Sequence, residues 1–214
     1  TGALLEVSDS EIVMVATNTH RLALKKNTLP NCSISAKMII PGKLLMELSK
    51  IINYDVPTDV HIYWLKNQVA FSFDNIYVMS RVIEGQFPDY KKVIPSDFSS
   101  FCIMESNLLY EAVERVSLLA KDGEYNIIKI KFTPKAIELA GNNPDAGSAI
   151  EILDVVPEGE PIEIAFNAKY LLDVLRIVGS GNVKFHLKSA LSPVMLKMLE
   201  DPEYTYILTP IRTN

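Results

Sequence analysis

The chain has 214 residues, of which 48% are apolar and 22% charged, and its formal net charge is -5 at pH 7. This length suits one or two ordinary globular domains. No apolar run approaches the ~18 residues of a membrane span, and the negative charge argues against a uniformly basic nucleic-acid binder but not against a local basic face. Cys32 and Cys102 form no CxxC motif, which favours reduced cysteines in a cytoplasmic protein.

The first half of the chain is predicted to form strands and one helix. Alternating apolar and polar residues predict strands at residues 3–7, 12–16, 20–25 and 37–41. A polar run at residues 8–11 turns the first two into a hairpin. Helical spacing predicts a helix at residues 43–52, with Pro41 and Gly42 at its entry. Strands separated by two-residue turns are expected at residues 59–65, 69–73 and 76–82.

A segment with two prolines and mixed charge, residues 84–97, lacks any periodicity and is the expected linker. We place the linker itself at residues 89–96. It then joins a first domain at residues 1–88 to a second at residues 97–214.

The second domain is predicted to open with a strand at residues 98–105 and a helix at residues 106–122, with Ser106 as the N-cap. Another helix is expected at residues 168–178. Strands should precede that helix at residues 127–132, 136–140, 149–155 and 162–166, and follow it at residues 183–188, 194–198 and 204–210.

Three blocks of the first domain recur in the second, in the same order and at an offset of about 125 residues. IPGKLLMELSKII resembles FNAKYLLDVLRIV, EIVMVATN resembles AIELAGNN, and IYVMSRVIEG resembles TYILTPIRT. The chain therefore holds two copies of one domain. Helices lie between groups of hairpins, which predicts an α+β fold with curved antiparallel sheets and two helices on one face of each complete copy.

The first copy lacks the strand and helix with which the second copy begins. A complete first copy would have about 30 to 35 more residues at its N-terminus. We therefore expect a fragment of a longer protein. The alternative, a natural half-domain, would leave an apolar face uncovered.

The sequence offers no motif for catalysis, a cofactor or a metal ion. The histidines, His20, His61 and His186, stand at no metal-ligand spacing from one another or from a cysteine. The sequence lacks GxSxG and GxxxxGK[ST], and GSGN at residues 179–182 is typical of a turn after a helix. We expect no catalytic residue, metal or cofactor. An enzyme acting on a small molecule remains an alternative, which a deep pocket with paired titratable groups would favour.

Two segments are unusual for plain structure. ATNTHRLAL, at residues 16–24, has a polar centre between well-patterned strands and is either a simple polar turn or a functional loop. YILTPIRTN, at the end of the chain, is apolar almost to its last residue, whereas most chain ends are polar and frayed. Such an end packs either on its own domain or on a partner.

Both segments belong to a set of motifs that resembles the bacterial DNA polymerase III beta subunit family, the sliding clamps. The motifs are THRLAL, EGQFPDY, the NNP at residues 142–144, EILDV at residues 151–155, FNAKYLLDVL and the final TPIR. They span nearly the whole chain in the family's order. The resemblance covers most of the middle copy and all of the last copy of the family's three domains.

The resemblance implies a fold, a function and partners. Two full-length chains are expected to close a ring around duplex DNA, with helices lining the hole and sheets outside. Such a ring is no enzyme but tethers the replicative polymerase to its template. Polymerases and the clamp loader dock short peptides, with a glutamine and one or two bulky apolar residues, in an apolar pocket between the middle and last domains. A fragment without the first domain is expected to be a monomer or a non-native dimer.

The resemblance also implies which residues form the peptide pocket. They are Thr17, Thr19, His20, Arg21, Leu22, Pro88, Lys92, Val93, Tyr125, Asn167, Tyr170, Leu191, Pro193, Val194, Ile207, Leu208, Thr209, Pro210, Ile211 and Arg212. The family often has glycine in place of Thr19, methionine in place of Thr209 and Ile211, and a small residue in place of Pro193. These departures change the shape of the pocket and its peptide preference, while the pocket stays apolar.

Basic residues on the predicted helices are candidates for contact with DNA: Lys43, Lys50, Arg115, Lys121, Lys169 and Arg176. The first two and the last two are each separated by two helical turns, so each pair shares a helix face. A basic face would meet phosphates without sequence preference and in a salt-dependent way. Ordinary solvated helices are one alternative, and a protein-interaction scaffold without DNA is another. By resemblance, Leu118 and Leu119 lie at the ring interface.

Overall fold

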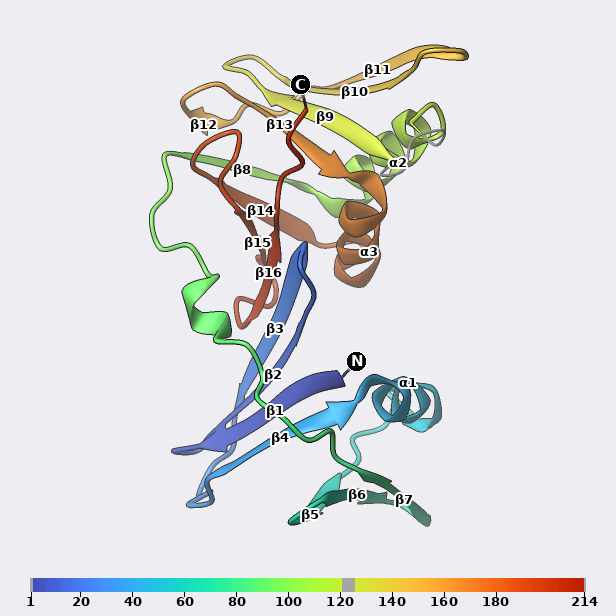
Figure 1. The fold of residues 1–214 in the computed structure, drawn as a ribbon. Helices are drawn as coiled ribbons and strands as arrows, with labels where there is room; N and C mark the ends of the chain where they lie inside the picture. Colours follow the sequence, from blue (N-terminus) through green and yellow to red (C-terminus); the bar gives the residue numbers. More distant parts are fainter. Residues whose placement is uncertain (1, 121–125, 214) are drawn as a thin grey trace. The chain divides into compact units, whose positions relative to one another are not determined.

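The computed structural model describes residues 2–120 and 126–213 (Figure 1). The chain divides into two compact units. The first consists of Thr1–Thr17 and Leu24–Tyr90, and the second of Asn18–Ala23 and Lys91–Asn214. The short segment Asn18–Ala23 therefore belongs to the second unit although it lies early in the sequence.

The first unit contains two antiparallel sheets and one helix. Strands of the first sheet follow the order β3-β2-β1-β4 and are β1 (Gly2–Ser8), β2 (Glu11–Thr17), β3 (Arg21–Thr28) and β4 (Ala36–Pro41). The first three residues of β3 belong to the second unit. The second sheet consists of β5 (His61–Leu65), β6 (Gln68–Phe73) and β7 (Ile76–Arg81). Helix α1 (Gly42–Ile51) follows β4 directly.

The two turn residues explain the hairpin that β1 and β2 form in the first unit. The two turn residues between β1 and β2, Asp9 and Ser10, have φ angles of 48° and 65°. Two positive φ angles in a two-residue turn match the twist of the flanking strands. The hairpin brings Leu5 into a core with Met38 of β4 and Phe71 of β6.

The second unit is larger and contains two sheets and two helices. One sheet follows the order β12-β8-β14-β15-β16, with β12 (Glu158–Gly159), β8 (Ser100–Glu105), β14 (Asn182–Leu187), β15 (Val194–Met198) and β16 (Tyr204–Leu208). The other follows β11-β10-β9-β13, with β11 (Gly147–Leu153), β10 (Ile137–Asn143), β9 (Ile127–Phe132) and β13 (Ile162–Asn167). The helices are α2 (Ser106–Ser117) and α3 (Ala168–Val178).

Apolar residues at alternate strand positions and along one face of each helix form the core of the second unit. Phe132, Phe166 and Phe185 are fully buried there. The helices α2 and α3 pack side by side and add an apolar stripe each (Figure 1). The residues of these stripes are Leu109, Ala112, Val113, Val116, Leu171, Val174 and Leu175.

The two units repeat one order of elements, which confirms the predicted α+β fold of repeated domains. In the first, β4 leads into α1 and then β5-β6-β7; in the second, β13 leads into α3 and then β14-β15-β16. Even a backbone hydrogen bond recurs. The Ile83 N–H donates to the Ile39 carbonyl at 2.8 Å, and the Ile211 N–H donates to the Ala165 carbonyl at 2.8 Å.

Several local predictions differ from the structure; the last strand, for example, was predicted at residues 204–210 and ends at Leu208. Ser106 is the first residue of α2 rather than its N-cap, because its buried hydroxyl donates to the Leu175 carbonyl at 3.1 Å. Helix α2 ends at Ser117 rather than at residue 122, since the next turn tightens into i→i-3 hydrogen bonds; residues 121 and 122 lie outside the described residues. The linker contains a short 3₁₀ helix, η1 (Tyr90–Lys92).

His186 lies in an aromatic setting on β14. Its ring is 5.0 Å from that of Phe98 and 5.2 Å from that of Phe101. Among the described residues, neither ring nitrogen has a hydrogen-bond partner. Burial, with smaller effects from Lys184 and Lys197, lowers the pKa of His186 from 6.5 to about 4. The imidazole is therefore neutral in the native protein at pH 7.

Candidate functional site

The polar segment before β3 is a turn held by one side chain. The Asn18 Oδ1 atom accepts hydrogen bonds from the backbone N–H groups of His20 and Arg21, at 2.9 and 3.0 Å. The Asn18 N–H donates to the Arg21 carbonyl at 3.0 Å. Asparagine forms such turns readily because its side chain can bond to the backbone two or three residues on. The turn fixes the direction in which His20 and Arg21 leave the backbone.

The apolar end of the chain packs on the second unit itself. The Thr209 N–H donates to the His20 carbonyl at 2.9 Å, and the Ile211 N–H to the Ala165 carbonyl at 2.8 Å. Thr209, Pro210 and Ile211 are half-buried. Packing on its own domain is therefore confirmed for this segment, and its half-exposed side chains still present apolar surface.

Tyr170 of α3 joins these two segments into one site. Its ring stacks on that of His20, with 5.9 Å between centroids and 24° between planes. The Arg21 guanidinium lies over the same ring, 4.3 Å from its centroid. A pocket of about 190 Å³ is lined by His20, Asn167, Tyr170, Thr209, Pro210 and Ile211. It has room for about one large apolar side chain, with polar groups at its rim.

Arg21 is anchored by a second layer of contacts. Its Nη1 atom pairs with the Asp173 Oδ2 atom at 2.6 Å and donates to the Tyr206 hydroxyl at 3.4 Å. Burial opposes the charge, but these two hydrogen bonds hold the pKa of Arg21 above its usual value. The Tyr206 hydroxyl donates in turn to the Tyr170 carbonyl at 3.0 Å. The guanidinium is thus fixed over the Tyr170 ring before any ligand arrives.

Four of the residues expected in the pocket pack in the core instead of offering surface. Leu22, Val194, Ile207 and Leu208 are all at most 1% exposed. Val194 and Leu208 pack in the core of the second unit. Ile207, the neighbour of Leu208 in β16, is buried on the opposite face of the sheet. Their contribution is to support the strands that carry His20 and Thr209.

The remaining expected residues fall into three groups. Thr19, Lys92, Val93, Leu191 and Arg212 are exposed, and Pro193 is half-buried. Thr17 and Pro88 belong to the first unit. Tyr125 lies outside the described residues. The part that these residues play in the pocket stays a prediction.

Sequence reasoning missed Asp173 and Tyr206, which position Arg21. A signal for Asp173 was present, because it lies one helical turn after Tyr170 and shares its helix face. No local signal marks Tyr206, since an alternating tyrosine in a strand is ordinary core sequence.

The basic helix residues that the structure describes are exposed, and several of them pair with carboxylates. Lys50 pairs with Glu47 at 3.0 Å on α1, while Lys43 is exposed. In the second unit, Lys169 is exposed on α3.

Both arginines of this set are paired. Arg115 of α2 pairs with Glu151 at 2.8 Å, and this hydrogen bond raises the pKa of Arg115. Arg176 of α3 donates a hydrogen bond to the Tyr110 hydroxyl at 3.3 Å and pairs with Asp173 at 3.8 Å. Lys121 lies outside the described residues. Exposed pairs of this kind contribute little and exchange readily for phosphate contacts.

An exposed apolar edge lies beside the end of α2. Leu118 is 59% exposed and Leu119 is half-buried in the turn after the helix. On the edge strand β11, Ile150 and Ile152 are also exposed. The sequence pointed to the two leucines but not to the two isoleucines, whose alternation with polar residues gave no sign of which face is outward.

The described part of the chain holds neither a metal-ligand cluster nor a membrane-spanning helix. No group of three or more histidine, cysteine, aspartate or glutamate residues there is arranged to hold a metal ion. Within the same residues, no helix has the length and apolar character needed to cross a membrane.

Two models of known protein domains show which family the chain belongs to. The model of the DNA polymerase III beta subunit, C-terminal domain, matches residues 91–212, and that of the central domain matches residues 1–89. The chain belongs to this family. Its two units are thus clamp-family domains, in the order expected from the sequence.

Individual clamp-family members agree with this assignment. The beta sliding clamp of Staphylococcus aureus is 34% identical over 214 residues, which are 100% of this chain and 56% of the relative. The crystal structure of the DNA polymerase sliding clamp from Bacillus subtilis matches with a TM-score of 0.94 and 34% identity, over 100% of this chain and 57% of the other. The beta subunit of Streptococcus pyogenes gives 0.93 and 29%, over 100% and 58%. The chain spans about half the length of the curated relatives it matches.

Proposed function

We propose that this chain forms the middle and last domains of a DNA replication processivity factor, an accessory subunit without catalytic chemistry of its own. The observation that carries the proposal is the cluster of His20, Tyr170 and Ile211, found in a chain of the sliding-clamp family. In this proposal residues 1–88 and 97–214 are the domains, residues 89–96 link them, and the protein acts in the cytoplasm.

The cluster is suited to anchoring a short linear peptide. One bulky apolar side chain of the peptide would enter the 190 Å³ pocket against Tyr170, Pro210 and Ile211. Exposed residues of the expected set that belong to the second unit, among them Thr19, Leu191 and Arg212, would contact the rest of the peptide. A few buried anchors dominate the affinity of such contacts, which suits exchange between polymerases and a clamp loader.

The helices supply the proposed contact with duplex DNA. Lys43 on α1 and Lys169 on α3 occupy matching positions in the two repeats and are exposed. Neither forms an ion pair with a described residue. They are therefore the cations most ready to meet phosphates.

Reversing the charge of Lys43 and Lys169 together in the full-length protein is expected to weaken binding to linear duplex DNA at least about 10-fold at about 100 mM salt. The salt slope should fall by about 4, because a ring of two chains loses four lysines. Fluorescence anisotropy over a range of salt concentrations measures both. Lys135→Glu, in the exposed turn between β9 and β10, is the matched control. An unchanged affinity and slope in the double variant would favour the scaffold alternative.

In this proposal two full-length chains close the ring, with Leu118 and Leu119 at the interface. The present chain is then monomeric, and light scattering should give a mass near 23.9 kDa. A mass twice as large that falls on Leu118→Asp would show that this edge pairs with a second copy and would contradict the expectation.

A protein-interaction scaffold without DNA is the second candidate. The ion pairs of Arg115 with Glu151 and of Arg176 with Asp173 favour it, because they reduce the positive charge of the helices. These pairs are exposed and weak, however, so phosphates can displace the carboxylates. The processivity factor is therefore the better supported function.

A further inference from the structure

One carboxylate on α3 contacts residues of both proposed sites in the second unit. The Asp173 Oδ2 atom pairs with Arg21 at 2.6 Å, and its Oδ1 atom pairs with Arg176 at 3.8 Å. Arg21 lies over the ring of Tyr170, which lines the peptide pocket, at 4.3 Å from the ring centroid. Arg176 is one of the helix residues expected to face DNA. Asp173 therefore joins the peptide pocket to the basic helix face.

Arg176 lines a groove that suits a phosphate group. The groove has a volume of about 450 Å³ and is lined by residues of α2 and α3, among them three cations, Arg115, Lys169 and Arg176. Asp173 lines it too. Lys169 forms no ion pair with a described residue. Three cations around one hollow attract the phosphates of duplex DNA without sequence preference.

The two arginines compete for Asp173. Each guanidinium carries a positive charge, so each weakens the attraction of the other to the shared carboxylate. The side chains of Arg21 and Asp173 are 28% and 32% exposed, whereas that of Arg176 is 66% exposed. The shorter and less exposed pair with Arg21 is the stronger one, and the longer pair with Arg176 exchanges readily.

A phosphate at Arg176 changes this balance. It neutralises the Arg176 guanidinium, which leaves Asp173 to Arg21 alone. Arg21 is then held more firmly over the Tyr170 ring, whose backbone carbonyl already accepts a 3.0 Å hydrogen bond from the Tyr206 hydroxyl. A pocket wall that is fixed before the peptide arrives loses less freedom when the peptide binds.

We propose that Asp173 couples the two sites, so that duplex DNA bound in the Arg176 groove strengthens peptide binding at the Tyr170 pocket. Asp173 is a positioning residue that acts on the peptide through Arg21. The inference rests on the proposed function, because it assigns a regulation to the sites of that function. Coupling between two binding sites is reciprocal, so the peptide should strengthen DNA binding by the same factor. A protein on DNA then retains its peptide partners better than a free one.

An uncharged peptide, acetylated and amidated Gln-Leu-Ala-Leu-Phe, tests the coupling without responding directly to distant charges. Isothermal titration calorimetry measures its affinity for the 214-residue chain in the absence of DNA. Arg176→Gln removes the competing charge and should tighten binding about 3-fold, because an exposed ion pair has a small free energy. Arg176→Lys keeps the charge and should bind the peptide as the wild type does.

A double variant shows whether Asp173 transmits the effect. Asp173→Asn keeps the shape of the side chain but removes the charge that holds Arg21, so it should weaken peptide binding at least about 5-fold. In that background Arg176→Gln should no longer change the affinity, because no shared carboxylate remains. The same gain with and without Asp173 overturns the proposal, as does an Arg176→Gln affinity equal to that of the wild type.

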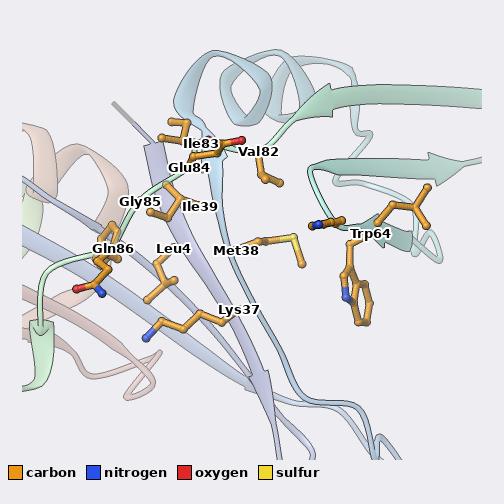
Figure 2. A pocket seen from close by; sticks show the side chains of 13 residues that line it. Leu4, Lys37, Met38, Ile39, Trp64, Val82, Ile83, Glu84, Gly85 and Gln86 are labelled. Atoms are coloured by element: carbon orange, nitrogen blue, oxygen red, sulfur yellow. The ribbon is translucent and has the colours of Figure 1, made fainter.

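Two control variants remove one positive charge elsewhere. Lys135→Gln lies in the exposed turn between β9 and β10 of the second unit. Lys37→Gln lies in the first unit, where Figure 2 shows Lys37 on β4 at a separate pocket that Trp64 also lines. Both variants should leave the peptide affinity unchanged, since neither lysine forms an ion pair with Asp173.

A linear duplex completes the test. At low salt, where non-specific binding is tightest, a saturating duplex should raise the peptide affinity of the wild type about 3-fold and leave that of Arg176→Gln unchanged. An equal rise in both proteins, or no rise in the wild type while both ligands bind, overturns the coupling and leaves the proposed function standing. If the wild type binds no peptide or no duplex, the proposed function fails and the coupling fails with it.

Discussion

Removing residues 210–214 is expected to abolish peptide binding, with a loss of at least about 100-fold in affinity. The intact chain should bind a peptide of the pattern Gln-Leu-x-Leu-Phe with a Kd of about 1 μM, which is about -8 kcal/mol. The deletion takes away Pro210 and Ile211, two of the residues that line the pocket beside Tyr170. It also removes the 2.8 Å hydrogen bond that fixes Ile211 to Ala165. Isothermal titration calorimetry measures both affinities.

The matched control removes only residues 213 and 214, which leaves the pocket lining intact and should preserve the affinity. Circular dichroism of both shortened chains shows whether the second unit still folds. If the longer deletion binds the peptide as tightly as the intact chain, the pocket has been assigned to the wrong residues.

The stability of the second unit is expected to fall by about 2 kcal/mol between pH 7 and pH 4.5 through His186 alone. In the unfolded chain this histidine gains its proton near pH 6.5, whereas burial lowers its pKa to about 4 in the folded protein. The unfolded state therefore binds more protons in this window, so the stabilising effect is complete above pH 6.5 and is lost as the pH falls toward 4. Urea unfolding at several pH values measures the change.

A substitution isolates this contribution. His186→Leu removes the titrating ring while keeping an apolar side chain next to Phe98 and Phe101, so its stability should depend less on pH in the same window. His61→Leu, at an exposed position, should keep the wild-type pH dependence. Parallel pH profiles for the wild type and His186→Leu would show that the imidazole is not buried in its neutral form.

Elements whose ends are set by residues close in the sequence could be predicted from the sequence alone. Helix α3 has the predicted bounds because Asn167 caps its start, accepting from the Lys169 N–H at 3.0 Å, and Gly179 ends it with a φ angle of 64°. The hairpin at Asp9 and Ser10 was equally readable, since turn residues interrupt two alternating strands. The internal repeat then extended these local signals to the order of elements in each unit.

Features that depend on contacts between residues far apart in the sequence could not be predicted from it. Serine often caps helices, but the Ser106 hydroxyl donates to the Leu175 carbonyl, which is 69 residues away in the sequence. Arg21 reaches Asp173 across 152 residues, and no spacing rule connects them. Arg21 and Arg176 share the Asp173 carboxylate because the segment before β3 lies beside α3, which the pattern of neither segment reveals. In each case tertiary packing, rather than local propensity, decides the outcome.

The proposed peptide site lies in the second unit, at the cluster around Tyr170. Backbone amide chemical shifts of the ¹⁵N-labelled chain, followed during titration with the Gln-Leu-x-Leu-Phe peptide, test it most directly. The largest shifts are expected at His20, Arg21, Tyr170 and Ile211. Shifts that are largest on β4 and β5 of the first unit, or no saturable shift at all, would contradict it.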